Sequence, residues 1–192
     1  MPEATATDRG RQVRQRLRVA ASELVPELGW AGVSTRLLAQ RAGVAPGLVH
    51  YHFSSLHALL REAVLEVMRE LLGQLATRLE QTDSLDAGLD VILGSVGACT
   101  DRDPTSLLFA EAYLAAARDE QMREALAALL TDLRRTVAHW LNRHSHPTPD
   151  HTALVLAAAL DGLLLHRALD PGLTPARVAP VLRRLLHLHG DE

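Results

Sequence analysis

The stretch from Val33 to Phe53 limits the fold of this chain more than any other, because it reads as two short helices joined by a tight turn. Ser34 is a suitable N-cap for the first helix, since its hydroxyl oxygen can accept a bond from a free backbone N–H of the opening turn. Gly43 follows that helix, where a left-handed backbone is often required. Pro46 suits the start of the second helix, because its missing N–H would have no partner there. The pattern predicts a helix-turn-helix, whose second helix can enter a DNA major groove.

The remaining sequence also predicts helices and no strands. Hydrophobic residues make up 47% of the 192 residues and aromatic residues only 3%, so the core must consist of Leu, Ala and Val, a composition that favours helix over sheet. Further helices are expected at 9–28, 54–80, 84–100, 104–118, 120–144, 149–169 and 174–189. The helix at 54–80 would be about 40 Å long. The predicted fold class is all-α, with an N-terminal three-helix domain at 9–53 and a C-terminal helical bundle at 54–192. Residues 1–8 are expected to form a disordered tail.

Charge is distributed unevenly along the chain. The net charge of the whole sequence is −3, which by itself disfavours a nucleic-acid partner. The first 62 residues, however, hold eight arginines and five acidic residues, a net charge of +3, so the other 130 residues sum to −6. A basic N-terminal part on an acidic body is compatible with DNA binding. The arginines of the first helix can contact phosphates or form an ordinary solvated helix face, and both interpretations remain open.

The second short helix supplies the side chains most suited to a groove. Gly47 would let its backbone approach DNA closely, and Tyr51 can offer its hydroxyl to a phosphate oxygen, whereas Leu48, Val49 and Phe53 should face the core. His52 can bind a phosphate or serve as a buried structural histidine. The complete set of predicted DNA-binding residues is Arg14, Arg18, Ser34, Thr35, Arg36, Ala45, Pro46, Gly47, His50, Tyr51 and His52.

A set of residues spread over the first third of the chain resembles the DNA-binding domain of TetR-type transcriptional regulators. The set consists of Gly29, Val33-Ser34-Thr35, Leu38-Ala39, Ala42-Gly43-Val44, Gly47 and His50-Tyr51-His52-Phe53. The resemblance is dense from about Val19 to Leu65 and only architectural beyond that. It implies a homodimer on double-stranded DNA, and a C-terminal domain (residues 54–192) that binds an effector and dimerises.

The chain departs from this family pattern at three positions. Ala45 stands where a capping Ser or Thr is usual, and His50 replaces a common Tyr. Leu56 stands where the family usually has a Lys that holds a phosphate. DNA affinity is therefore expected to depend more on arginine and on helix N-termini than in a typical member.

Apolar side chains with a few polar groups in the C-terminal part describe a small-molecule pocket, and they describe a helical core equally well. Gly88, Gly94 and Gly97 either leave room beside a cavity or allow close helix packing. The candidate pocket residues for a small apolar or amphipathic effector are Met68, Cys99, Phe109, Tyr113, Met122, His139 and Trp140.

The last two long helices carry more apolar surface than one side of a thin bundle can cover, which favours burial against a second copy. The predicted dimer interface consists of Leu156, Leu160, Leu163, Leu164, Arg167, Val178, Leu182 and Leu185. Two recognition helices about 34–36 Å apart would then read a palindromic operator.

Other classes of protein have little support. The histidines at 139, 144, 146 and 151 match no known metal-site spacing, and neither a catalytic pattern nor a phosphate loop is present, so we expect no metal, no cofactor and no enzyme activity. The longest apolar run, 153–165, is too short to span a bilayer, and no signal peptide is evident, which predicts a cytoplasmic protein without a membrane partner. The single cysteine fits a reducing compartment.

The sequence thus predicts a homodimeric regulator, most simply a repressor that a small molecule releases from DNA. Two alternatives remain: a dimeric DNA-binding protein without an effector, and a helical interaction protein or small enzyme that has lost DNA binding. The substitutions at Ala45, His50 and Leu56 keep the second alternative open.

Overall fold

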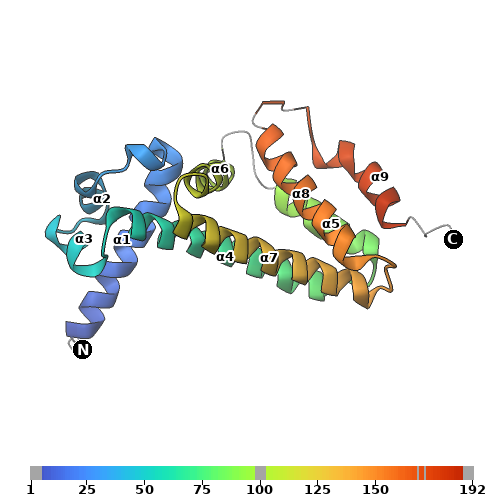
Figure 1. Ribbon diagram of the computed structural model, residues 1–192, viewed down its shortest axis with the longest axis horizontal. Helices are drawn as coiled ribbons and strands as arrows, with labels where there is room; N and C mark the ends of the chain where they lie inside the picture. Colours follow the sequence, from blue (N-terminus) through green and yellow to red (C-terminus); the bar gives the residue numbers. More distant parts are fainter. Residues whose placement is uncertain (1–5, 98–102, 168, 171, 188–192) are drawn as a thin grey trace. The chain divides into compact units, whose positions relative to one another are not determined.

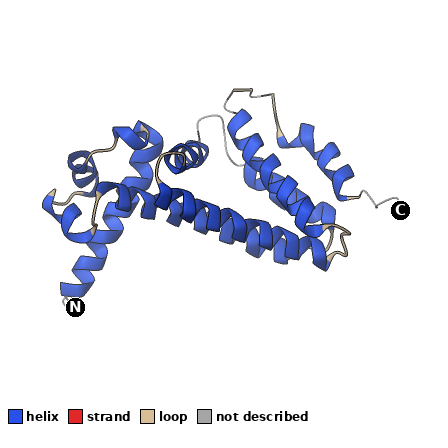
Figure 2. Cartoon of the chain, in the orientation of Figure 1, coloured by secondary structure: helices blue, strands red, loops and turns tan. Residues whose placement is uncertain are grey.

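The computed structural model describes residues 6–97, 103–167, 169–170 and 172–187, and most of these residues lie in helices. Within these ranges the chain contains helices and connecting loops and no strand (Figure 2). This confirms the predicted all-α class. The chain divides into an N-terminal unit, Met1–Met68 with Leu107–Glu124, and a C-terminal unit, Arg69–Ser106 with Ala125–Glu192.

The N-terminal unit is built around α1 (Ala6–Leu28), which packs against α2 (Thr35–Ala42) and α3 (Gly47–His52) (Figure 1). A short 3-10 helix, η1 (Trp30–Gly32), connects α1 to α2, and α4 (Leu56–Glu80) contributes its first half. The unit also includes most of α6 (Pro104–Ala116) and the first residues of α7 (Glu120–Arg143). Leu17, Leu38, Val49, Leu59 and Val64 are completely buried.

Local capping explains where α2 begins and ends and where α4 begins. The Ser34 hydroxyl accepts the Leu37 N–H (3.3 Å), and Gly43 closes α2 in the left-handed conformation (φ 63°), as the sequence predicts. The Ser55 hydroxyl accepts the Ala58 N–H (3.0 Å) at the start of α4. The N-cap of α3 is Pro46, which makes no side-chain hydrogen bond, in line with the missing cap at Ala45.

A segment distant in sequence completes the N-terminal unit. The Glu111 carboxylate of α6 accepts the backbone N–H of Trp30 (2.6 Å), the first residue of η1. The carboxylate lies beside Gly29, whose φ of 74° places it in the left-handed region. Arg61 of α4 pairs with Asp119 (3.7 Å). Residues 107–124 therefore pack with the helix-turn-helix, which the predicted boundary after residue 53 does not anticipate.

The C-terminal unit packs α5 (Leu85–Gly97), α8 (Pro149–Arg167) and α9 (Pro175–Leu186) together with the second half of α4 and most of α7. Its core consists mainly of leucine, with Trp140 as the one large aromatic side chain among the described core residues. Trp140 is 2% exposed and donates its indole N–H to the Thr82 hydroxyl (3.0 Å). The hydroxyl in turn donates to the Leu79 carbonyl (2.7 Å), so the buried polar atoms are paired.

Helix boundaries differ from the predicted ones by a few residues, as is usual for helix ends. Differences of three residues occur at the start of α1, which already begins at Ala6, within the expected tail, and at the end of α9, which ends at Leu186. None of the described helices combines the length and apolar character that a bilayer-spanning segment requires.

Candidate nucleic-acid interface

The short helix α3 has one buried side and one exposed side. Val49 is completely buried and Phe53, just after the helix, is 5% exposed, so both face the core as predicted, while Leu48 is half-buried. On the opposite side Tyr51 is 80% exposed, and His50, Pro46 and Gly47 are exposed as well. A Cβ at Gly47 would meet no atom within 4 Å, so this surface is open. The exposed side of α3 is therefore free to contact a large partner.

His52 lies at the edge of this surface. Its ring is half-buried and packs edge-to-face on Tyr51, with the ring centroids 4.9 Å apart. Among the described residues its ring nitrogens have no hydrogen-bond partner, and the backbone bond expected for a structural histidine is not formed. A ring N–H is therefore free to donate to an anion.

The start of α2 adds polar groups next to α3. Arg36 is exposed, and no ion pair joins it to any described residue. Thr35 is half-buried and Ser34 is exposed, with its hydroxyl oxygen used as the cap of α2. Ala45 is exposed in the turn, and its carbonyl accepts the Leu48 N–H (3.0 Å). Leu56, the first residue of α4, brings no charge to this side.

Arg14 and Arg18, predicted to bind DNA, make ion pairs within the N-terminal unit. Arg14 pairs with Glu62 of α4 (2.6 Å), and Arg18 pairs with Glu62 (3.0 Å) and Glu66 (3.1 Å). Glu62 and Glu66 are not among the residues predicted from the sequence. Two arginines in α1 and two glutamates in α4 share a four-residue spacing, and this match could have indicated that they pair. Contact of these arginines with DNA stays a prediction.

Other arginines of the basic N-terminal part are also engaged. Arg41 of α2 bonds to Glu27 (2.7 Å) and Glu23 (3.3 Å) of α1, and its hydrogen bond holds the pKa of the Glu27 carboxyl below the usual range. The Arg16 guanidinium donates to the Gly43 carbonyl (2.9 Å). Among the described arginines of residues 1–62, Arg9 and Arg36 are those without an ion pair or hydrogen bond. The positive charge available to a phosphate is therefore smaller than the arginine count suggests.

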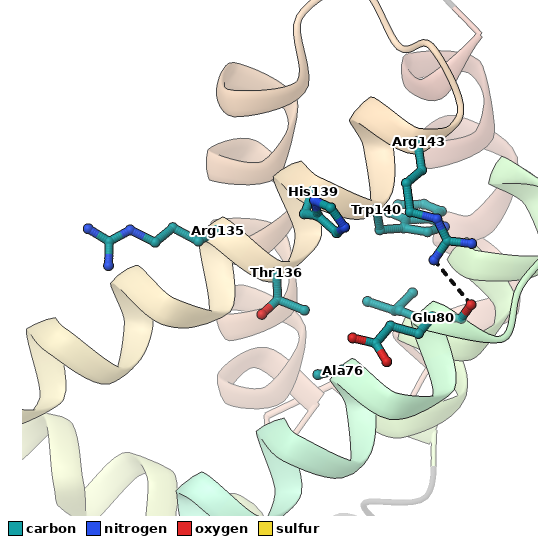
Figure 3. Close-up of a pocket in the computed structure, with 8 residues that line it drawn as sticks. Ala76, Glu80, Arg135, Thr136, His139, Trp140 and Arg143 are labelled. Atoms are coloured by element: carbon teal, nitrogen blue, oxygen red, sulfur yellow. Dashed lines mark hydrogen bonds between the residues drawn. The ribbon is translucent and has the colours of Figure 1, made fainter.

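A separate pocket lies in the C-terminal unit between α4 and α7 (Figure 3). Its volume is about 260 Å³, and Arg143 at its edge donates to the Glu80 carbonyl (3.1 Å). His139 and Trp140 lie on one side and Ala76 and Glu80 on the other. The full lining is Ala76, Leu79, Glu80, Arg135, Thr136, His139, Trp140 and Arg143. Three of these eight residues are apolar and five are polar or charged, a mixture that suits a small amphipathic ligand.

The seven predicted effector-pocket residues do not all line this pocket. His139 and Trp140 do, but Met68, Phe109, Tyr113 and Met122 belong to the N-terminal unit. Met68 and Met122 are completely buried there. Cys99 lies outside the described residues. In the described parts of the chain, no three His, Cys, Asp or Glu side chains come together as metal ligands.

The predicted dimer interface includes four side chains that lie in the core of the chain itself. Leu156, Leu160, Leu163 and Leu182 are each at most 7% exposed, so they have little surface left for a partner. Arg167 donates to the Val96 carbonyl (2.6 Å), Leu164 and Val178 are partly buried, and Leu185 is 37% exposed. Besides Leu185, the exposed large apolar side chains of the last two helices are Leu154, Val155, Leu165 and Val181, with Leu169 just after α8.

Comparison with known proteins identifies the family. Residues 17–63 match the family model "Bacterial regulatory proteins, tetR family", and residues 83–188 match "Tetracyclin repressor-like, C-terminal domain". The chain is 26% identical over 168 residues to the transcriptional regulator BetI of Vibrio vulnificus (strain YJ016), covering 82% of both chains.

Solved structures agree. A transcriptional regulator from Streptomyces coelicolor A3(2) is 31% identical, with a TM-score of 0.75 over 92% of this chain and 99% of its own. The multidrug binding protein EbrR, solved with imidazole, is 28% identical, with a TM-score of 0.68 over 93% of this chain and 97% of its own. The chain therefore belongs to the TetR family, as a DNA-binding helix-turn-helix transcriptional regulator.

Proposed function

We propose that this protein is a repressor that binds a palindromic operator as a homodimer and is released when a small molecule occupies its C-terminal unit. The observation that carries the proposal is the exposed polar side of α3, with Tyr51 80% exposed opposite the fully buried Val49. A six-residue helix that holds one side in a core and leaves polar side chains open suits insertion into a major groove.

The effector would bind in the pocket between α4 and α7. Its volume of about 260 Å³ is near the lower end of the range for small-molecule sites, so the ligand should be small. Glu80, Thr136 and His139 supply polar groups, and Leu79 and Trp140 supply apolar surface. The relative EbrR holds imidazole, which supports a small-molecule site in this chain as well.

Helix α4 would couple the pocket to DNA binding. It is one continuous helix from Leu56 to Glu80, with its first residues in the N-terminal unit and its last turns in the pocket wall. A ligand can weaken DNA binding only if it binds more tightly to the conformation that does not fit the operator than to the one that does. The required difference in affinity is about 1–3 kcal/mol for an ordinary allosteric response.

The dimer would form through the exposed apolar face of α8 and α9. Leu154, Ala158, Gly162 and Leu165 follow one another at helical spacing in α8, and Leu169 lies just after it. A groove of about 350 Å³, which includes Gly162, is lined by residues of α8 and α9 and by Leu173. Apolar patches of this kind mark interaction surfaces. Twofold symmetry would bring two copies of α3 to half-sites one DNA turn apart.

The proposal is tested by fluorescence anisotropy of the purified protein on labelled duplexes from the DNA flanking its own gene. A scrambled duplex of equal length is the control, and salt is varied, because non-specific binding is almost entirely electrostatic. Tight binding to one palindromic segment supports the proposal. Equal, weak and salt-sensitive binding to every duplex in this region speaks against it.

The effector is tested on the same complex with a panel of small amphipathic compounds that includes imidazole. A compound that binds the protein and releases the labelled operator supports the repressor mechanism. A compound that binds tightly in the α4–α7 pocket and leaves DNA affinity unchanged contradicts the proposed coupling, and favours a dimeric DNA-binding protein without an effector.

A further inference from the structure

We infer that Arg14 and Glu62 form a clamp that positions the recognition helix α3, so that Arg14 acts on DNA binding through α3 and not by contacting a phosphate. This inference deepens the proposed operator recognition and rests on it. The clamp is defined here as the Arg14 and Glu62 side chains and the α3 end that they hold.

The Arg14 guanidinium makes three contacts, two at the end of α3 and one with α4. One terminal nitrogen donates to the His52 carbonyl (3.1 Å) and the other bonds to the Glu62 carboxylate (2.6 Å). The guanidinium carbon lies 4.4 Å from the centre of the Phe53 ring, in cation–π geometry. One side chain of α1 thus joins the last residue of α3, the residue after it, and α4.

The contact with His52 addresses a weakness of α3. The last carbonyls of any helix have no partner within the helix, and α3 has only six residues and no side-chain cap at its start. Arg14 satisfies one of these carbonyls with a charged donor, which is stronger than a neutral one. Because Tyr51 and His52 lie in the same last turn, the clamp sets the direction in which they point.

Glu62 keeps Arg14 in this position. It accepts bonds from Arg14 and Arg18 together, and Arg18 is held further by Glu66. The two arginines and two glutamates therefore carry no net charge. Such a group offers little attraction to a phosphate, in contrast to the exposed Arg36, which has no carboxylate partner in the described part of the chain.

Glu62→Gln distinguishes the two roles because it predicts opposite signs. If Arg14 bound a phosphate, removal of the carboxylate charge would free the arginine and raise affinity for any DNA. If Arg14 positions α3, the weaker clamp should lower affinity for the specific operator by about five- to tenfold, roughly the effect of one hydrogen bond. Binding to a random duplex should rise modestly in either case, because the variant carries one negative charge fewer, so the sign of the change on the operator is the readout.

Arg14→Ala and Arg36→Ala complete the experiment. Arg36→Ala, the matched control, should weaken binding to both the operator and the random duplex. It should also lower the slope of log affinity against log salt concentration by about 0.9, the value for one phosphate contact. Arg14→Ala should weaken binding to the operator and leave the salt slope of binding to the random duplex unchanged. Each variant is checked by circular dichroism and assayed well below its melting temperature. Higher affinity of Glu62→Gln for the operator, or a reduced salt slope for Arg14→Ala on the random duplex, overturns the inference.

A measurement without DNA separates this inference from the proposed function. Hydrogen exchange of residues 44–55 should be faster in Arg14→Ala and Glu62→Gln than in the wild type, and exchange in α2 should be unchanged. Unchanged exchange at 44–55 overturns the clamp, even if a palindromic operator exists. Faster exchange supports the clamp, even if no operator is found beside the gene.

Discussion

The indole ring of Trp140 lies directly on the backbone of Gly88, in the space that any other side chain would occupy. A Cβ atom at Gly88 would be 2.1 Å from Cζ2 and 2.3 Å from Cε2 of the ring. The ring cannot easily move, because its N–H is bonded to Thr82 and it is 2% exposed. Gly88 therefore allows close helix packing and does not leave room beside a cavity. This packing brings α5 and α7 together.

Gly88→Ala should therefore lower the free energy of unfolding by about 1–3 kcal/mol, the usual cost of overpacking a core. Gly94→Ala, in the same helix, is the matched control, since its Cβ would lie 4.0 Å from its nearest neighbour, the Arg78 guanidinium. The control should gain about 0.5–1 kcal/mol from the better helix propensity of Ala. Urea unfolding followed by tryptophan fluorescence measures both, and equal stabilities of the two variants would contradict the packing argument.

Tyr51→Phe should weaken binding to the operator by about three- to tenfold, because it removes one hydroxyl hydrogen bond to DNA. The ring is 80% exposed, so the melting temperature should not change. Anisotropy titration measures the affinity and differential scanning fluorimetry the stability. An unchanged operator affinity would mean that the exposed side of α3 does not approach DNA at this residue.

Ala76→Leu should abolish the response to an effector and leave operator affinity intact, because the larger side chain fills the pocket between α4 and α7. Ala128→Leu is the control, since Ala128 is an exposed residue of α7 outside the pocket lining. Release of the labelled operator by the effector is the measurement. A normal response in Ala76→Leu would place the effector elsewhere.

Leu165→Glu should convert the dimer into a folded monomer. A charge is costly to bury in an apolar interface, which should prevent dimerisation. Leu165 is 44% exposed in the single chain, so the charge should not disturb the fold. Leu160→Ala, at a position 6% exposed in the same helix, should instead lower the free energy of unfolding by about 2–5 kcal/mol. Sedimentation velocity and thermal unfolding separate the two effects. A Leu165→Glu variant that remains dimeric would exclude this face as the interface.

Stability should fall as the pH drops below about 6.5, through His146. Burial lowers the pKa of this imidazole, which is 7% exposed, and the charge of nearby His187 lowers it further, while an interaction of the imidazole as donor with the Leu185 backbone raises it. Its Nδ1 accepts the Thr148 N–H (3.2 Å), which a proton on that nitrogen would prevent. The unfolded chain therefore binds more protons near pH 6, so the stabilisation is complete above pH 6.5 and is lost toward lower pH.

Melting temperatures at pH 7.5 and 5.5 test this prediction. His146→Gln should show a smaller difference between the two melting temperatures than the wild type. One histidine can change the free energy of unfolding by at most about 1.4 kcal/mol per pH unit. His50→Gln, at an exposed position, should behave like the wild type. Identical pH dependence in wild type and His146→Gln would exclude His146 as the source.

Features that depend on a few neighbouring residues could be predicted from the sequence. The Ser34 cap, the left-handed Gly43 and the burial of Val49 and Phe53 all follow from backbone geometry and apolar spacing within one or two turns. The family resemblance rests on the same local set.

Features that depend on which helix packs against which could not be read from the pattern. Basic residues in α1 look alike in sequence, yet Arg14 and Arg18 are paired with Glu62 and Glu66 of α4, 44 or more positions away along the chain. In the same way Glu111 holds the backbone of Trp30, which places part of α6 with the helix-turn-helix.

The sequence by itself determined the helices, their caps and the recognition motif, because these depend on interactions within a few residues of one another. Only the tertiary structure decided which of the apolar and charged side chains remain available for a partner. Leu160 is taken into the core and Leu165 is not, although both lie in one apolar run of α8. The reason is that availability depends on the neighbouring helix, and a sequence pattern describes one helix at a time.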